Sequence, residues 1–278
     1  MSAGLAGVLP AAARFQEDDI DEPYLWSDLL ARRNALGLRV EDIVPALRVD
    51  KGKYHSRETG SLKVSKHLVD ELIAMEEFVA SQTEQLLAAA PAEGIAVLHA
   101  VTDQGAFESA YPDARTLRDL VAYPVALQYV AVGRAAAELS RRGRDVEVRR
   151  GDRRADLVVR RLATGLLKDE TARLLGVSGA HYAKFERGTS APPAGLLAEL
   201  QAIDDFIATT AADLEVTEAN DVSVVMVPDD DGFERAYPQA RTRRDNVPYP
   251  RRVLRVAAGR RAHALEAAGP LVRIAVVN

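Results

Sequence analysis

The chain has 278 residues, no cysteine and a formal net charge of −5. Without cysteine it can form neither disulfides nor thiolate metal sites, and its apolar runs are too short to span a bilayer. Hydrophobic residues make up 47% and aromatic residues 5%, so we expect a cytoplasmic protein with a core of Ala, Val and Leu, long enough for two domains.

The net negative charge counts mildly against a nucleic-acid ligand, but the charges are unevenly distributed. Residues 15–28 hold six acids and no base, whereas residues 241–261 hold eight arginines and one acid, and residues 140–161 hold nine arginines and four acids. Such patches are typical of a protein with an anionic partner, although each patch alone is equally well explained as a solvated surface.

The first predicted element is a flexible acidic arm over residues 1–25, rich in Ala and Gly before the acids begin. An amphipathic helix is expected from Trp26, with Ser27 or Asp28 as its cap. The fold class predicted for the rest is mainly α with small β parts.

An internal duplication dominates the chain. Residues 28–60 align without a gap on residues 156–188, with twelve identities at a constant offset of 128. A second block, 107–124, matches 233–250 at an offset of 126. Two blocks in the same order exclude chance similarity, and we interpret the chain as two fused units.

Each unit is predicted to be a helical bundle followed by a smaller subdomain with strand, short helix, helix and strand. Strand-like runs occur at 95–101 and 222–228, and later at 145–150 and 271–277; helices are expected at roughly 124–141 and 250–267. The domains expected after the arm are helix-turn-helix domains at 26–90 and 151–218, and strand-containing subdomains of the dimerisation type at 91–150 and 219–278.

The best-formed motif is Gly165–Pro193, which has the pattern of a helix-turn-helix. Apolar residues at helical spacing predict a helix over 166–175, Gly176 provides the turn, and Ser178 caps a short second helix over 179–187. A short helix held at a wide angle to its neighbour can enter the major groove of DNA.

The outward face of each short second helix carries the candidate DNA contacts. Lys and Arg can donate to guanine edges or phosphates, Ser and Thr to phosphates, and His to either. The first helix is the more basic of the two. The candidates are Lys51, Lys53, His55, Ser56 and Arg57 in the first unit, and His181, Lys184, Arg187, Thr189 and Ser190 in the second.

Four repeated residues are predicted to be structural rather than functional. Arg33 lies late in the first helix of its unit and Glu58 late in the short helix, so the two are expected to form a partly buried ion pair; Arg161 and Glu186 repeat them. Tyr54 and Tyr182, one turn earlier, are more readily explained as core residues than as base-stacking platforms.

The sequence contains no pattern that indicates an enzyme. The five histidines are not spaced as metal ligands, and the chain has no phosphate-binding glycine loop and no nucleophile elbow. The acidic run 229–232 is better explained as a helix cap than as a calcium loop. We therefore expect no cofactor, no metal and no catalytic residue.

The second unit resembles the YdiL-like, anti-CRISPR-associated helix-turn-helix regulators. The resemblance rests on HYAKFERGTSAPP at 181–193 together with VPDDDGFERAYPQA at 227–240. The first unit matches less well, because Arg57 replaces an aromatic residue and the proline run is absent. The resemblance implies transcriptional repressors that dimerise through their C-terminal parts on inverted repeats, and hence a single-chain pseudo-dimer here.

The sequence therefore predicts a sequence-specific DNA-binding transcriptional regulator, in the main a repressor or autorepressor, whose unequal helices would bind an imperfect inverted repeat on double-stranded DNA. Two alternatives remain open. One is an RNA-binding translational regulator. The other is a protein-interaction scaffold in which only one helix-turn-helix contacts DNA. No membrane partner is expected, and self-association of the two units within the chain is.

Overall fold

The structure is a computed structural model that describes residues 24–278 apart from 220, 268, 270 and 278. The arm predicted over residues 1–25 therefore lies almost wholly outside the described residues. Tyr24 is an exception, because it is 3% exposed and packs in the core. The packed core thus begins before Trp26, ahead of the predicted boundary.

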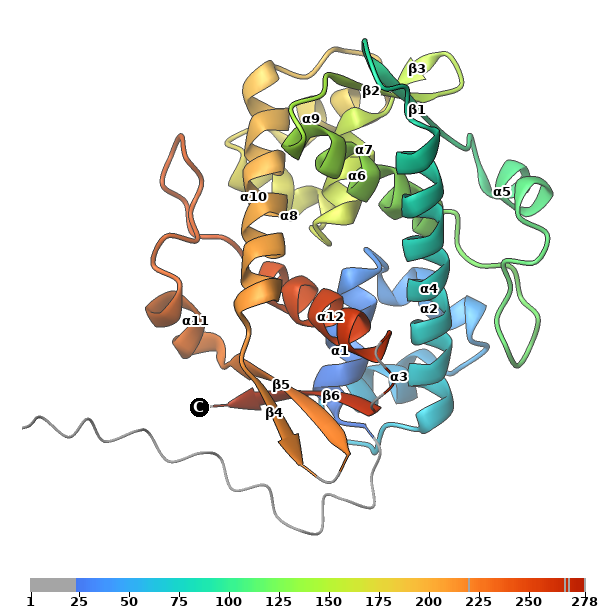
Figure 1. Ribbon diagram of the computed structural model, residues 1–278, viewed down its shortest axis with the longest axis vertical. Helices are drawn as coiled ribbons and strands as arrows, with labels where there is room; N and C mark the ends of the chain where they lie inside the picture. The colour runs from blue at the N-terminus through green and yellow to red at the C-terminus, as the bar shows by residue number, and fades with distance from the viewer. Residues whose placement is uncertain (1–23, 220, 268, 270, 278) are drawn as a thin grey trace, which may run out of the picture.

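The described part of the chain is a mixed α/β structure dominated by helices, with two small three-stranded sheets (Figure 1). Its first half, residues 24–150, contains α1 (Trp26–Ala35), α2 (Val40–Ala46), α3 (Lys51–Glu58), α4 (Lys66–Ala89), β1 (Ala96–Ala100), α5 (Gln104–Ala110), α6 (Ala126–Arg141) and β2 (Val146–Arg150).

The second half, residues 151–277, repeats this order with two additions. It contains β3 (Arg153–Arg154), α7 (Asp156–Ala163), α8 (Lys168–Leu174), α9 (Gly179–Glu186), α10 (Ala194–Asp213), β4 (Val216–Ala219), β5 (Val222–Pro228), α11 (Asp230–Ala236), α12 (Arg252–Glu266) and β6 (Leu271–Val277). Helix α8 begins two residues later than predicted, after Gly165 has turned the chain with a φ of 69°. Strands β3 and β4 were not predicted.

Each sheet is built on one parallel pair of strands. β1 pairs with β2, and β5 pairs with β6, with the registers Ala96↔Val146 and Val222↔Leu271. Parallel neighbours need a crossover, which the α5–α6 and α11–α12 segments provide. The additional strands are antiparallel: β3 on β2 and β4 on β5.

Equivalent positions in the two halves are called matched: the offset is 128 up to residue 90 and 126 beyond it. Matched residues make matched contacts. Asp103 and Asp229 each cap a short helix by accepting a backbone N–H, from Ala106 at 2.9 Å and from Gly232 at 2.6 Å. The acidic run at 229–232 therefore begins with a helix cap.

The first helix of each half packs on the last helix of the other half. The closest helix contacts are those of α1 with α12 and of α7 with α6. They depend on matched glycines: a Cβ at Gly133 would lie 2.2 Å from the carbonyl oxygen of Val159, and one at Gly259 would lie 2.9 Å from that of Ala31. The resemblance implied that the strand-containing parts would pack on each other, whereas here each packs on the other half's first helix.

The first helix of each half also bonds to a sheet. Asp28 Oδ1 accepts the N–H of Ile274 in β6 at 2.8 Å, and the matched Asp156 Oδ1 accepts that of Val148 in β2 at 3.0 Å. Ser27 adds a hydrogen bond to the Ile274 carbonyl at 2.5 Å. The start of each first helix is thus bonded to the middle of a strand of the opposite half, α1 to β6 and α7 to β2.

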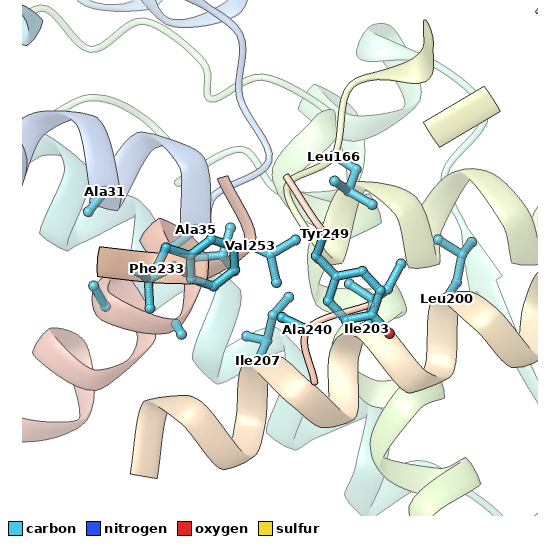
Figure 2. Packing of buried hydrophobic residues seen from close by; sticks show 14 of the residues in the cluster. Ala31, Ala35, Leu166, Leu200, Ile203, Ile207, Phe233, Ala240, Tyr249 and Val253 are labelled. Atoms are coloured by element: carbon cyan, nitrogen blue, oxygen red, sulfur yellow. The ribbon is translucent and has the colours of Figure 1, made fainter. Parts of the chain in front are cut away.

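The buried hydrophobic residues follow this exchange. Figure 2 shows Ala31 and Ala35 of α1 among side chains of the second half, including Phe233 and Val253. A second cluster fills the first half around Leu72 and Phe107, and a third joins β1, α6 and β2 to α7.

An ion cluster joins α1 to α4 and to the end of α12. Arg32, which is 0% exposed, donates to Glu76 at 3.3 Å and to Glu266 at 2.6 Å. Burial raises the pKa of Glu76 to about 7, against the attraction of Arg32. Burial, with the nearby charges of Arg134 and Arg32, lowers the pKa of His263 to about 4. The cluster therefore holds a neutral imidazole beside two arginines.

Among the helices described here, none combines the length and the apolar character that crossing a membrane would require.

Candidate nucleic-acid interface

The helix α3 buries one face and exposes the other. Its N-terminus is capped by Asp50, whose side chain accepts the N–H of Lys53 at 2.9 Å. Tyr54 and Glu58 are buried one turn apart. Of the predicted contacts, Lys51, Lys53 and His55 are exposed and Ser56 and Arg57 are half-buried.

Two of these cations already have partners within the protein. Lys51 Nζ lies 2.7 Å from Glu41 Oε1 in a pair that is exposed on both sides, so water and salt weaken it. Arg57 donates to the carbonyl of Lys53 at 3.2 Å. Lys53 and His55 are exposed on the same turn of the helix, on either side of its buried face.

The helix α9 is built in the same way but carries fewer cations. Ser178 caps it as predicted, and its hydroxyl lies 2.8 Å from His181 Nδ1. His181, Lys184, Arg187 and Thr189 are exposed or half-buried at its surface, as is Ser190. Thr189 donates to the carbonyl of Lys184, which closes the end of the helix. Lys184 and Arg187 are therefore the cations that α9 itself offers.

The four structural residues meet in pairs. Arg33 and Glu58 form a two-point bond, with Nε–Oε1 at 2.5 Å and Nη2–Oε2 at 2.9 Å, and both are buried. Arg161 Nε lies 2.5 Å from Glu186 Oε1. Burial alone would lower the pKa of Arg33, but its hydrogen bond and attraction to Glu58 raise it. Each short helix is thus held to the first helix of its half.

The two tyrosines are core residues. Tyr54 and Tyr182 are both 0% exposed, and burial raises the pKa of each hydroxyl. Neither ring is available for base stacking, so the surfaces of α3 and α9 are polar and cationic.

Basic residues from distant parts of the sequence flank α9. A Cβ at Gly188, two residues after the end of α9, would lie 3.1 Å from Arg153 Cβ and 2.8 Å from the Arg154 carbonyl oxygen. At the other end, in the turn between α8 and α9, a Cβ at Gly176 would lie 3.4 Å from Asp245 Oδ2. The segment 153–154 and the loop that contains Asp245 therefore lie at opposite ends of α9.

That loop, residues 240–249, is held rigidly below its exposed tip. Glu199 of α10 accepts the backbone N–H of Arg243 at 3.1 Å and that of Arg244 at 3.0 Å. The side chains of Arg243, Arg244, Asp245 and Asn246 are exposed. Sequence reasoning placed these arginines in a basic patch but assigned them no role. The patch was the available signal, and only the fold brings it beside α9.

Other arginines of the two basic patches serve the interior. Arg160 donates to Gln201 at 2.6 Å and to Ser140 at 2.8 Å. Arg260 donates to Asp204 at 2.7 Å and to the carbonyl of Ala163. Arg160 thereby links the two halves through Ser140, whereas Arg260 stabilises the interior of the second half, so an arginine count overstates the cationic surface.

Two other places gather polar groups. A cavity of about 430 Å³ lies between Trp26, the 229–231 turn and α12, and it mixes acids with Arg251 and Arg255. Oxygen and nitrogen atoms of Glu76, His263 and Glu266 lie within 4.8 Å of one another, as in a metal site. There the guanidinium of Arg32 already bonds both carboxylates, so it supplies the positive charge that a metal would bring.

Comparison with protein-family models gives no match, and comparisons with curated proteins and with solved structures also give none. Function is therefore inferred from the geometry of α3 and α9.

Proposed function

We propose that the protein is a sequence-specific DNA-binding transcriptional regulator in which α3 and α9 are the recognition helices of two helix-turn-helix units. The observation that carries the proposal is the repeated surface: two short capped helices, each with a buried Tyr and an ion-paired Glu on one face and exposed Lys, His or Arg on the other. The resemblance of residues 181–193 and 227–240 to helix-turn-helix repressors supports it.

The arrangement of two such helices in one chain supports binding as a single-chain pseudo-dimer. In Figure 1, α9 lies toward one end of the long axis and α3 toward the other. Two recognition helices on one duplex would read half-sites one helical turn, roughly 34 Å, apart. Because Lys51, Lys53 and His55 are matched by Gly179, His181 and Ala183, we propose an imperfect inverted repeat.

The test is selection of bound sequences from a random duplex library, followed by binding of the selected site at several salt concentrations. The variants K53A/H55A and K184A/R187A remove exposed side chains from one helix each. We expect each pair to weaken specific binding by about 1–3 kcal/mol for each base contact removed and to relax the sequence of its own half-site.

A selection that yields no consensus would contradict the proposal. Two other outcomes identify the alternatives. Preference for structured RNA over duplex DNA in competition would favour an RNA-binding regulator. Sensitivity to K53A/H55A with full tolerance of K184A/R187A would favour a scaffold with one DNA-binding unit, which the lower charge of α9 makes the stronger alternative.

A further inference from the structure

We propose that Arg153 and Arg243 form a phosphate clamp around α9: two exposed arginines, one at each end of the helix, that contact the DNA backbone and compensate for the few cations on α9. The inference rests on the proposed function and extends it to residues outside the two recognition helices.

Arg153 and the 240–249 loop lie beside the two ends of α9. Arg153 Cβ lies against Gly188, two residues after the end of α9, and the 240–249 loop reaches the α8–α9 turn through Asp245. The N-terminal end of a recognition helix lies nearest the bases, so groups beside both ends of the helix lie over the backbone on either side of the groove. Arginines at these two places can contact phosphates while α9 occupies the groove.

The 240–249 loop is rigid. The loop is fixed by the two N–H bonds to Glu199, by Thr242, whose hydroxyl accepts the N–H of Val247 at 2.9 Å, and by Arg241, which donates to the carbonyl of Asn246 at 3.1 Å. Arg244 pairs with Asp245 at 3.2 Å, so Arg243 is the cation that the tip presents most directly. A fixed loop loses little entropy when its arginine binds.

The matched positions of the first half carry neither of the two arginines. The matched loop in the first half has the same scaffold, because Glu71 accepts the N–H groups of Leu117 and Arg118 at 2.8 and 2.9 Å. Its tip, however, exposes Leu117 and Leu120, which are 62% and 65% exposed. Position 153 is matched by Leu25. Thus Arg243 and Arg153 are both leucine in the half whose recognition helix is rich in cations.

The two arginines reduce the difference in charge between the α3 surface and the α9 surface. From residue 48 to 66 the first half carries six Lys and Arg residues, whereas residues 176–194 carry two. With Arg153 and Arg243 included, the number of cations at the α9 surface comes closer to the number at the α3 surface. Since neutralised phosphates determine the salt dependence of binding, the two sides would then contribute similarly to affinity although they read different bases.

The chain itself provides the substitutions for a test. R153L and R243L each install the matched residue of the other half. Leu117, the match of Arg243, already lies in a loop of the same construction, and Arg153 is exposed in β3. R235L removes an equally exposed arginine from α11, which Figure 1 places away from α9. The affinity for the selected duplex is measured at five or more salt concentrations for the wild type, the single variants and R153L/R243L, with thermal unfolding as a folding control.

For the double variant we expect the slope of log K against log salt to fall by about 1.8, about 0.9 for each phosphate contact removed, with the selected base sequence unchanged. R235L should leave the slope unchanged, and L117R should increase it by about 0.9. A slope unaltered by R153L/R243L while K53A/H55A still weakens binding overturns the clamp alone. A wild type that binds no duplex overturns the clamp and the proposed function together.

Discussion

His263 occupies a position that is alanine in the other half, Ala137, and its burial beside Arg134 and Arg32 lowers its pKa to about 4. In the unfolded chain a histidine titrates near 6.5. Between these values the unfolded chain binds more protons than the folded one. His263 therefore reduces the stability of the protein as the pH falls through this window.

We expect H263A to abolish this loss. As the pH is lowered from 7 to 4.5, the free energy of unfolding of the wild type should fall relative to that of H263A by roughly 1–3 kcal/mol. Glu76, whose pKa burial raises to about 7, acts in the opposite direction but is present in both proteins, so the difference isolates the imidazole. Urea denaturation across the pH range measures it. If the free energies of unfolding of the wild type and H263A changed in parallel over this pH range, His263 would be protonated in the folded protein as it is in the unfolded chain.

At this scale the sequence was informative where a residue recurs. Arg33 and Glu58 could be paired in advance because both recur at the same offset and sit at helix ends that must meet. The ion cluster around Arg32 could not be predicted in the same way. Its partner Glu266 is matched by Ser140, so the comparison of the two halves gives no indication of this contact between them.

Among the elements, the matched helix pairs α6–α7 and α1–α12 depend on close approach at a glycine. Ala is ordinarily the better helix residue by about 1 kcal/mol. At Gly133, however, a methyl group would lie 2.2 Å from the Val159 carbonyl oxygen and 2.8 Å from Ala163 Cβ. Both neighbours belong to α7, so α6 and α7 would have to separate.

We expect G133A to lower the free energy of unfolding by roughly 1–3 kcal/mol, the usual cost of overpacking, and G259A to act similarly on α1–α12. G195A in α10 is the control, because nothing lies within 4 Å of its Cβ position. It should be neutral or slightly stabilising. Denaturant midpoints decide the matter, and a G133A protein as stable as G195A would contradict the packing argument.

The order of the elements followed from periodicity: the strands at 96–100 and 222–228 and the helices α6 and α12 lie within two residues of their predicted limits. The added strands β3 and β4 escaped detection for different reasons. Arg153 and Arg154 form a two-residue strand of charged side chains. β4 begins at Val216, close behind the end of α10 at Asp213, and neither of the two residues between them is a turn former.

For the whole molecule, the duplication predicted two similar units but not how they exchange helices. An offset shows which residues are alike, and it is equally compatible with α1 packing in its own half or on α12. The choice is made by burial: Ala31 and Ala35 belong to the hydrophobic cluster of the second half. The flanking of α9 by 153–154 and 240–249 depends on the same tertiary arrangement.

We expect the halves to remain associated when the chain is cut between them. A protease site inserted between Gly151 and Asp152, in the turn that joins β2 to β3, should give two fragments that co-elute after cleavage, because each retains the helix on which the other packs. Fragments expressed separately should be largely unfolded and should recover helical circular dichroism on mixing. Two independently folded, non-associating fragments would contradict the exchanged packing.

The bond between Ser27 and Ile274 spans 247 residues of sequence. On the ribosome, α1 emerges long before the helix and strand that cover it have been synthesised. Its small apolar residues Ala31 and Ala35 therefore stay exposed, or are held by chaperones, until translation has nearly finished. A messenger truncated before the codons of α12 would yield a chain in which α1 has no α12 to pack on. Such incomplete products would be easy for cellular proteases to recognise.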